Sequence, residues 1–466
     1  VGQPMRLSVG ITNFGEIEIN DLSIQISINE NTSGLPINID SIKPGEEKII
    51  TAFVEIDSPG YLRIKAQIDY TDSKSVDNSR EIVIRAVEKI QTLLIDGEPG
   101  RSITESETFF LQNALIPVPE ELIESFFISS NIINLGSIQD IEIKDYDVIF
   151  LANVPDFSNE LSNRLNDFVK SGGGLVVFPG DNINASFYNQ ELHEKLNLLP
   201  ASYGKILPIE GSNSVLSLQA SGYNHPLVEL WNDPGAGTLG DVKTFKAFEL
   251  VLKDGVDSNI AIQYNNGSAA VIEADVGLGK VYQFSSSADT EWNDLPVKAA
   301  FLPIVHRVVG SVISRMDSGL NIQVGDTFIR KVPQSWINKE ATISHSKSET
   351  ATFINAEISD DGGNVQFNQV NSSGIYDLKL TEPFELIQFS ATSDPRESNP
   401  EKLSGPQIER LKEISSNFIE SSSLNEITSA INQKRKGAEI WPLLLLAALL
   451  LTLLELYLSQ KFSQEK

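Results

Sequence analysis

Apolar and polar residues alternate along the first 88 residues of the chain. The alternation is clearest in the runs MRLSVGITN, LSIQISIN, EKIITAFVEI, YLRIKAQIDY and REIVIRAV. A period of two predicts strands with one buried face, and turn sequences such as KPGE and SPG separate the runs. Five or more such strands predict a β-sandwich over residues 1–88.

The pattern changes between residues 89 and 316. The apolar runs IQTLLIDG, YDVIFLANV and GLVVFPGDN predict three buried parallel strands. SNELSNRLNDFVKSGG predicts an amphipathic helix that ends at glycine. ITESETFFLQNAL predicts another, with Thr104 as N-cap and Glu107 completing a capping box. GSAAVIEADVGLGKVYQFSSSAD predicts a hairpin, and DLPVKAAFLPIVHRVVGSVI a closing helix. Together these elements predict a doubly wound α/β domain.

Alternation returns between residues 317 and 392, in runs such as LNIQVGDTFIRKV and GIYDLKL. This stretch predicts a second, smaller β-sandwich. Residues 393–437 predict a linker and an amphipathic helix that Ser404 caps together with Gln407. The apolar residues of that helix recur at intervals of three and four positions, from Ile408 to Phe418.

The end of the chain contains the run IWPLLLLAALLLTLLELYL, with Glu455 as its one charged residue. A helix of this length spans roughly 28 Å, about the thickness of the hydrocarbon layer. Trp441 and Tyr457 lie near its two ends, as interfacial aromatic residues do. We therefore predict a transmembrane helix over residues 438–460, in contact with membrane lipid, and a short tail over 461–466. The alternative is a buried core helix.

Charge and cysteine content narrow the possible functions. The formal net charge is −27 and the sequence pI is near 4.5. Phosphate backbones attract basic surfaces, so this balance argues against nucleic acid as a partner. The chain has no Cys, which excludes thiol nucleophiles, thiolate metal sites and disulfides.

Polar residues follow three of the predicted strands of the α/β domain. Asp96, Asp181 with Asn182, and Asp289 each stand where a strand is predicted to end. Ligands collect beyond the carboxyl ends of strands in open α/β sheets, so these four residues are candidate ligand-binding residues. If the ends converge, the carboxylates have the oxygen ligands that a hard cation prefers. The alternative is ordinary helix caps and Asx turns.

Two other motifs give weaker evidence for a catalytic or nucleotide-binding site. SSSAD, from Ser285 to Asp289, follows a strand and offers hydroxyls that would need a base such as His306. GAGTLG, from Gly235 to Gly240, lacks the Lys-Ser/Thr of a phosphate-binding loop. We therefore expect strand-end turns in the first case and no nucleotide site in the second.

Several stretches resemble known families. TNFG, IKPGEEKIITAFVEI and DYTDSKSVDNSREIVI resemble the CARDB-type bacterial immunoglobulin-like module. The α/β domain resembles the class I glutamine amidotransferase-like fold, whose active members carry a Cys nucleophile on the turn after the third strand, served by His and Glu. The turn here is FPGDN, and none of the four histidines stands in a recognisable His-x-Glu dyad. The resemblance therefore covers the architecture and excludes that chemistry.

The order of the parts resembles the large BatA-domain bacterial membrane proteins of the aerotolerance-operon type. SSSADTEWNDLPVKAAFLPIVHRVV and KGAEIWPLLLLAALLLTLLELYLS carry most of this resemblance. Members usually have a second membrane helix and often a von Willebrand A-like domain upstream, so we expect this chain to be a fragment of a longer protein. The family implies that the soluble domains lie outside the cytoplasmic (inner) membrane, with von Willebrand A-domain proteins among the partners. The basic cluster at Lys434, Arg435 and Lys436 favours the opposite orientation.

These observations predict a non-enzymatic, membrane-anchored extracytoplasmic scaffold with a catalytically inactive amidotransferase-like domain. We expect no cofactor and no metal. The alternative is a hydrolase that uses a carboxylate or hydroxyl site in the α/β domain.

Overall fold

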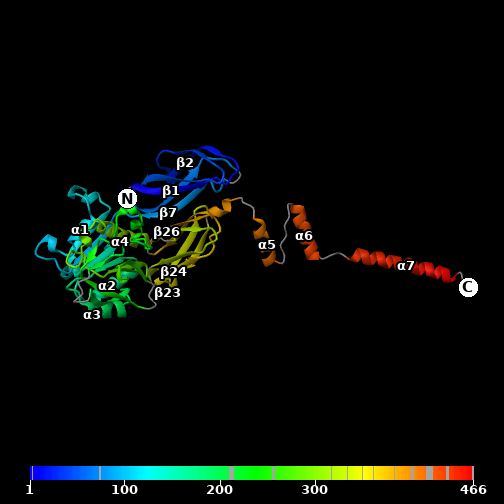
Figure 1. Ribbon diagram of the computed structural model, residues 1–466. Helices are drawn as coiled ribbons and strands as arrows, with labels where there is room; N and C mark the ends of the chain where they lie inside the picture. Colours follow the sequence, from blue (N-terminus) through cyan, green and yellow to red (C-terminus); the bar gives the residue numbers. More distant parts are fainter. Residues whose placement is uncertain are drawn as a thin grey trace. The chain divides into compact units, whose positions relative to one another are not determined.

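The computed structural model divides the chain into two compact units, Val1–Ser398 and Asn399–Lys466. Figure 1 shows the chain as a ribbon and labels several of its helices and strands. The structure describes residues 1–2, 4–72, 75–208, 215–253, 258–315, 317, 319–332, 334–348, 350–359, 362–382, 384–399, 403–415, 423–436 and 440–463.

The first part of the large unit consists of two antiparallel sheets that share a core. One sheet pairs β1 (Pro4–Thr12) with β5 (Glu47–Glu55). The other contains β3 (Asn31–Thr32), β2 (Ile19–Ile28), β6 (Gly60–Ile68) and β7 (Ser79–Ala86) in that order, with β4 (Ile37–Ile42) also paired to β2. Ile26 and Ile64 of the second sheet pack against Ala52 and Val54 of the first. This arrangement agrees with the sandwich predicted from the alternating pattern.

A seven-stranded sheet forms the centre of the α/β part. Its order is β16 (Ser258–Gln263), β17 (Ala269–Val276), β18 (Gly279–Phe284), β11 (Gly174–Phe178), β10 (Val148–Ala152), β8 (Ile90–Asp96) and β9 (Ile128–Asn134). The five strands from β18 to β9 are parallel, and β17 and β16 continue the sheet antiparallel. The hairpin of β17 and β18 confirms the one predicted from the VGLG turn.

Helices cover both faces of this sheet (Figure 1). Helices α1 (Phe109–Leu115) and α4 (Phe301–Arg315) pack on one face, where Leu111 and Ile304 are fully buried. Helix α2 (Asn159–Lys170) and the π-helix η5 (Tyr188–Lys195) pack on the other, through residues such as Leu165 and Leu192. Ser158 caps α2 by accepting a hydrogen bond from the backbone N–H of Leu161. A doubly wound layering is therefore observed, as the sequence predicted.

Short elements complete this part. The paired strands are β12 (Ala201–Leu207) with β15 (Ala247–Leu252), and β13 (Leu216–Ser217) with β14 (Lys243–Thr244). The short helices are η1 (Ile103–Glu105), η2 (Glu120–Ser125), η3 (Leu135–Asp140), η4 (Ile143–Asp145), α3 (Ala185–Phe187), η6 (Glu229–Asn232), η7 (Pro234–Ala236) and η8 (Leu295–Val297).

Two details of the predicted α/β domain were wrong. Strand β9 was not predicted, because Ser129, Ser130 and Asn131 interrupt its apolar run, as an edge strand with an exposed side permits. The capping box of Thr104 and Glu107 does not form, because Thr104 lies in η1 and α1 begins only at Phe109.

The last part of the large unit again contains two sheets. One has the order β19 (Asn321–Gln323), β26 (Glu385–Thr392), β25 (Gly374–Leu380), β21 (Glu340–His345) and β22 (Ala351–Asn355). The other has the order β20 (Phe328–Val332), β24 (Gly362–Phe367) and β23 (Glu357–Ser359), and η9 (Gln334–Trp336) and η10 (Pro395–Ser398) are the short helices of this part. Phe328 stacks on Phe389 across the two sheets, with ring centroids 3.8 Å apart. This shared core agrees with the smaller sandwich predicted there.

The first and last sandwiches contact each other directly. The side chain of Asn321 accepts a hydrogen bond from the backbone N–H of Val83 at 2.7 Å and donates one to its carbonyl oxygen at 2.8 Å. Val83 also packs against Leu320 and Ile375 in a small apolar cluster. Strand β7 is therefore held against the last sandwich although more than 200 residues separate them in the chain.

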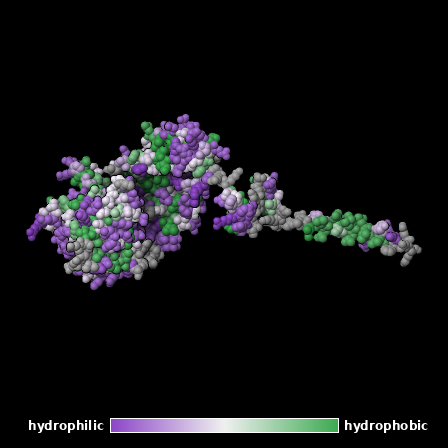
Figure 2. Space-filling model, in the orientation of Figure 1, coloured by the Kyte–Doolittle hydropathy of each residue, from purple (hydrophilic) through white to green (hydrophobic). Residues whose placement is uncertain are grey.

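The second unit is helical over its described residues. It contains α5 (Gly405–Ile414), α6 (Leu424–Lys436) and α7 (Trp441–Ser463). The capping box of Ser404 and Gln407 at the start of α5 confirms the prediction. Residues 441–461 are long and apolar enough to cross a membrane, and Figure 2 shows them as a continuous hydrophobic stretch. Phe418, the side chains of residues 434–436 and the end of the tail lie outside the described residues.

Candidate functional site

The polar cluster with the strongest structural argument lies where the sheet changes its direction of winding. Strands β8 and β10 are parallel neighbours, with Asp96 paired to Ala152 at their carboxyl ends. The chain leaves β8 toward α1 on one face and leaves β10 toward α2 on the other. Ligands of open α/β sheets bind in the crevice at such a switch point.

Asn153 occupies the centre of this switch point in a strained conformation. Its φ is +50°, in the left-handed region that asparagine tolerates better than most residues. Two glycines leave the space for it. A Cβ on Gly97 would come 1.9 Å from the backbone oxygen of Asn153, and one on Gly180 would come 2.3 Å from its Cγ. Strained residues held by their surroundings are concentrated at functional sites.

The Asn153 side chain connects three segments of the chain. Its Nδ2 donates to Oε1 of Glu107 at 2.7 Å and to Oε2 of Glu98 at 3.1 Å. Its Oδ1 accepts from the backbone N–H of Asn182 at 2.8 Å, and the Asn182 side chain also donates to Glu98 at 2.9 Å. These bonds tie the ends of β8, β10 and β11 to the segment that leads into α1.

Glu107 is the most perturbed acid of the cluster. Only 3% of it is exposed, and Oε2 has no hydrogen-bond partner among the residues that the structure describes. Burial, and then the charges of Asp289, Glu291 and Glu98, raise the pKa of Glu107 to about 8, against the opposing hydrogen bond from Asn153. The carboxyl is therefore mostly protonated at neutral pH, as desolvation among like charges dictates.

A cation, Lys246, also contacts the acids of this cluster. Lys246 forms an ion pair with Asp181, and this hydrogen bond is the main reason why the pKa of Asp181 is lowered. The Lys246 ammonium also lies 4.4 Å from the centre of the Trp292 ring, a cation–π geometry. The pKa of Glu291 is raised, first by burial and then by Asp289 and other neighbouring acids.

We call this group the switch-point cluster. Its members are Glu98, Glu107, Asn153, Asp181, Asn182, Lys246, Asp289 and Glu291.

The four predicted site residues have different surroundings. Asp181, Asn182 and Asp289 belong to the switch-point cluster, so the convergence of strand ends holds for these three. Asp96 is used structurally: its carboxylate accepts hydrogen bonds from Ser106 Oγ at 2.6 Å, from Thr108 Oγ1 at 3.1 Å and from the backbone N–H of Glu98 at 2.9 Å.

Asp289 forms an Asx turn and also acts electrostatically on the cluster, which are the two roles considered for it. Its Oδ1 accepts from the backbone N–H of Glu291 at 3.1 Å, which is an Asx turn, and its charge acts on Glu107. In the part of the chain that the structure describes, no three acidic or histidine side chains are grouped closely enough to hold a metal ion.

The serines after β18 do not face a histidine. Ser285 Oγ is 2.8 Å from the Tyr264 hydroxyl, and His306 Nε2 lies 2.8 Å from the backbone oxygen of Ala114. Ser286 donates to the backbone oxygen of Lys246 at 2.8 Å. These contacts pair the Ser285 hydroxyl with Tyr264 and the Ser286 hydroxyl with the backbone of Lys246, and the partner of His306 is a backbone oxygen.

Sequence reasoning missed five members of the cluster: Glu98, Glu107, Asn153, Lys246 and Glu291. Glu107 was assigned to a capping box, and Asn153 directly follows the apolar run of β10, one position beyond Ala152, which pairs with Asp96. A polar residue directly after a buried strand was the available signal. Lys246 lies far along the chain from the strand ends, and nothing in its surroundings marks it.

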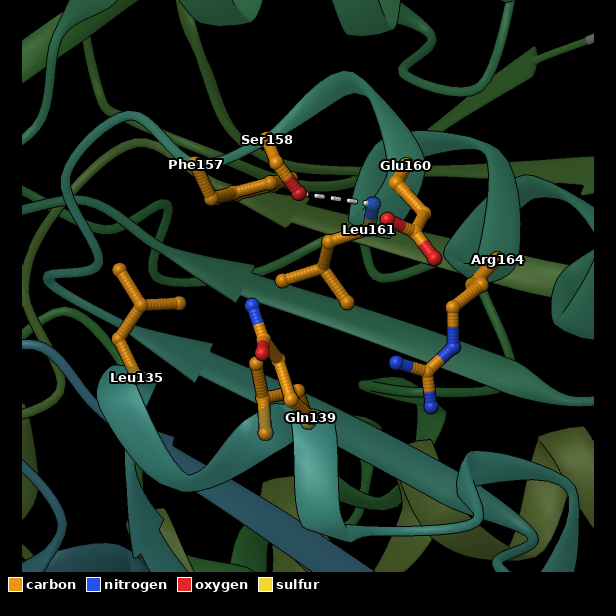
Figure 3. A pocket seen from close by; sticks show the side chains of 8 residues that line it. Leu135, Gln139, Phe157, Ser158, Glu160, Leu161 and Arg164 are labelled. Carbon is orange, nitrogen blue, oxygen red and sulfur yellow. Dashed lines mark hydrogen bonds between the residues drawn. The ribbon is translucent and has the colours of Figure 1, made fainter.

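A separate hollow of about 420 Å³ opens at the start of α2. Its lining residues are Leu135, Ile138, Gln139, Phe157, Ser158, Glu160, Leu161 and Arg164. Figure 3 shows Gln139, Leu161 and Arg164 facing the same space, between η3 and α2. Arg164 Nη2 donates to the backbone oxygen of Ile141 at 2.7 Å, so part of this guanidinium supports the wall of the hollow.

No protein-family model and no curated protein matches this chain. Among solved structures, the cytoplasmic proteins STM3548 and STM1381 of Salmonella typhimurium are 13% and 14% identical to it. Each covers 48% of this chain, over 98% and 99% of its own length, with TM-scores of 0.34 and 0.35. A β-galactosidase from Bacillus circulans sp. alkalophilus is 13% identical over 60% of this chain and 41% of its own, with a TM-score of 0.33. Similarities this weak support no inference about fold or activity.

Proposed function

We propose that the chain is a membrane-anchored interaction protein whose α/β domain binds without covalent catalysis. The observation that carries this proposal is the turn after β11, at Gly180, Asp181 and Asn182. In active members of the amidotransferase-like fold that the sequence resembles, the nucleophile stands on this turn. Here Asp181 is paired with Lys246, and Asn182 is bonded to Glu98. Helix α7 supplies the anchor.

Turnover measurements test the absence of catalysis. The full chain in lipid nanodiscs is incubated with amide, ester and acyl-transfer substrates, beside the Asp181→Ala variant. We expect no product above the protein-free rate from either. Turnover by the parent chain above the protein-free rate would overturn the proposal, and its loss in Asp181→Ala would assign the activity to the turn after β11.

A carboxylate-based hydrolase is the second candidate. One observation favours it: Glu107, with its pKa raised to about 8, lies near Asp289, and acid–base catalysis needs a group that titrates near neutral pH. A hydrolase of this kind would lose turnover with both Glu107→Gln and Asp289→Asn, whereas Asp181→Ala would leave it active. The pattern across the three variants separates the two candidates.

We propose that residues 1–437 lie outside the cytoplasmic membrane and that residues 462–466 lie in the cytoplasm. The resemblance to BatA-domain proteins supports this orientation, and the basic residues before α7 are then available to anionic headgroups. Protease added to intact spheroplasts should degrade the large unit of the full-length protein. Protection that persists until the membrane is broken, with cleavage in a detergent-treated control, would reverse the orientation.

The same resemblance suggests von Willebrand A-domain membrane proteins as partners. Affinity purification from native membranes, followed by mass spectrometry, should recover such proteins with the parent chain. Their absence, in a preparation that retains other membrane complexes, would contradict this part of the proposal.

A further inference from the structure

One carboxyl oxygen of Glu107 is buried in an unusual state. Glu107 is 97% buried, since 3% of it is exposed, and Oε1 is already bonded to Asn153. Oε2 is buried without a hydrogen-bond partner among the described residues. A buried polar atom left in this state is unfavourable, so a ligand that supplies the missing bond gains binding energy from it.

The charges around this oxygen specify the kind of ligand. Asp289, Glu291 and Glu98 all act on Glu107 as like charges. Lys246 does not balance them at Glu107, because its ammonium is bonded to Asp181 and lies over Trp292. The Glu107 carboxyl therefore lies in an uncompensated negative potential, which favours a cation.

The arrangement of acceptors favours an ammonium over other cations. The described residues contain no group of three side chains suited to a metal ion. A guanidinium binds best to a carboxylate with both oxygens free, and one oxygen of Glu107 is occupied by Asn153. An ammonium is a compact charge with three separate donors, and the acids here come from three different segments of the chain.

We propose that the switch-point cluster binds a primary ammonium group, which donates a hydrogen bond to Glu107 Oε2 and is balanced by the Asp289 carboxylate. The ammonium belongs to a small amine or to a lysine side chain of a peptide. This inference rests on the proposed non-covalent role of the α/β domain and names its ligand class.

Binding exchanges one cation for another. Before binding, Glu107 carries a proton at neutral pH, because burial and the neighbouring acids raise its pKa to about 8. The incoming ammonium favours the carboxylate form, so the carboxyl proton leaves to solvent and the total charge of the occupied cluster is unchanged. At pH 7 about 0.9 proton is released per ligand, and at pH 9 about 0.1, from the protonated fraction of a group with this pKa.

Isothermal titration calorimetry of the full chain, in phosphatidylcholine nanodiscs, measures the affinity for the ligand and the number of protons released. The probe is propylamine hydrochloride, and propan-1-ol is the neutral control of similar shape. Repeating the titration in phosphate and in HEPES at one pH gives the number of protons released. A second arm uses the peptide acetyl-Gly-Lys-Gly-amide, so tighter binding of the peptide than of propylamine identifies a lysine side chain as the source, and the reverse identifies a small amine.

Three variants make the result specific. Glu107→Gln should weaken propylamine binding at least tenfold and abolish proton release. Asp289→Asn keeps an oxygen acceptor for the Asx turn, but should weaken binding and reduce proton release at pH 7. Glu194→Gln, an exposed acid elsewhere on the same domain, is the control for net charge and should bind as the parent does.

Three results would overturn the inference: no binding of either probe by the parent up to about 10 mM, equal binding of propan-1-ol, or proton release that Glu107→Gln leaves unchanged. None of these would affect the proposed interaction role. Conversely, chemical conversion of a bound amine to product would contradict the non-covalent role while the binding site itself remained.

Discussion

Replacing Glu107 by Gln tests whether a buried, titrating carboxyl limits the stability of the α/β domain. The amide keeps the Oε1 acceptor that Asn153 uses, and it resembles the protonated carboxyl in size and in lacking charge. The substitution therefore removes the titration and changes the packing little. We expect the variant to be more stable than the parent at neutral pH, which is unusual for a buried residue.

The size of the effect follows from the pKa of Glu107. Its ordinary pKa is 4.5, and in the folded protein it is raised to about 8. The folded state therefore binds more protons than the unfolded state between these values, and its stability falls as the pH rises through this range. At about 1.4 kcal/mol per pH unit, the parent loses at most about 3 kcal/mol of stability between pH 5 and pH 7 through this group.

Native-state hydrogen exchange at the buried amides of β8 and β10 reports the opening of this domain within the full chain. Corrected for intrinsic exchange rates, the free energy of opening should match in parent and variant near pH 5. The variant should exceed the parent by up to about 3 kcal/mol at pH 7, with Glu194→Gln behaving as the parent at both. A difference between Glu107→Gln and the parent that is the same at pH 5 and pH 7 would refute a raised pKa at Glu107.

Three further substitutions have expected outcomes that the same exchange measurement checks. Gly97→Ala should destabilise the α/β domain by about 2–4 kcal/mol, because the new Cβ would overlap the backbone of Asn153, whereas Gly136→Ala has open space and should cost less than about 1 kcal/mol; equal costs would contradict the close approach. Leu165→Ala should cost about 3 kcal/mol, because this fully buried side chain leaves a cavity under α2; a cost below about 1 kcal/mol would contradict its burial. Asn321→Ala should raise exchange in β7 selectively by about tenfold, since it removes two bonds between the sandwiches; equal acceleration throughout the large unit would argue against a local joint.

The regular elements were predictable wherever burial imposes a period on the sequence. The strands of both sandwiches alternate because one face of each sheet is buried. Strands β10 and β11 are apolar throughout, and β8 is apolar from Leu93 to Ile95, because helices cover both faces of this sheet. Strand β9 was not predicted, because an edge strand is partly exposed and tolerates polar residues. The contact between the two sandwiches was not predictable either, because the hydrogen bonds of Asn321 to Val83 impose no period on the sequence.

The candidate site was predictable only in its location. The rule that ligands collect at strand ends led to Asp181, Asn182 and Asp289, and these residues do lie in the switch-point cluster. It also led to Asp96, whose carboxylate accepts hydrogen bonds from the hydroxyls of Ser106 and Thr108. Local sequence cannot distinguish these cases, because the partners come from segments that only the folded sheet brings together.

Glu107 shows why a local rule failed at this position. In a capping box the glutamate accepts a hydrogen bond from the N-cap backbone, and other nearby hydrogen-bonding groups can prevent this arrangement. Here the hydroxyls of Ser106 and Thr108 donate to Asp96. This fixes the chain so that α1 begins at Phe109 and the Glu107 carboxyl lies beside the Asn153 amide. The helix loses a cap worth about 1 kcal/mol, and the folded chain retains a carboxyl whose pKa has risen to about 8, which costs more than the lost cap. The ammonium that we propose for this site would offset part of this cost, because it would supply the hydrogen bond that Glu107 Oε2 lacks.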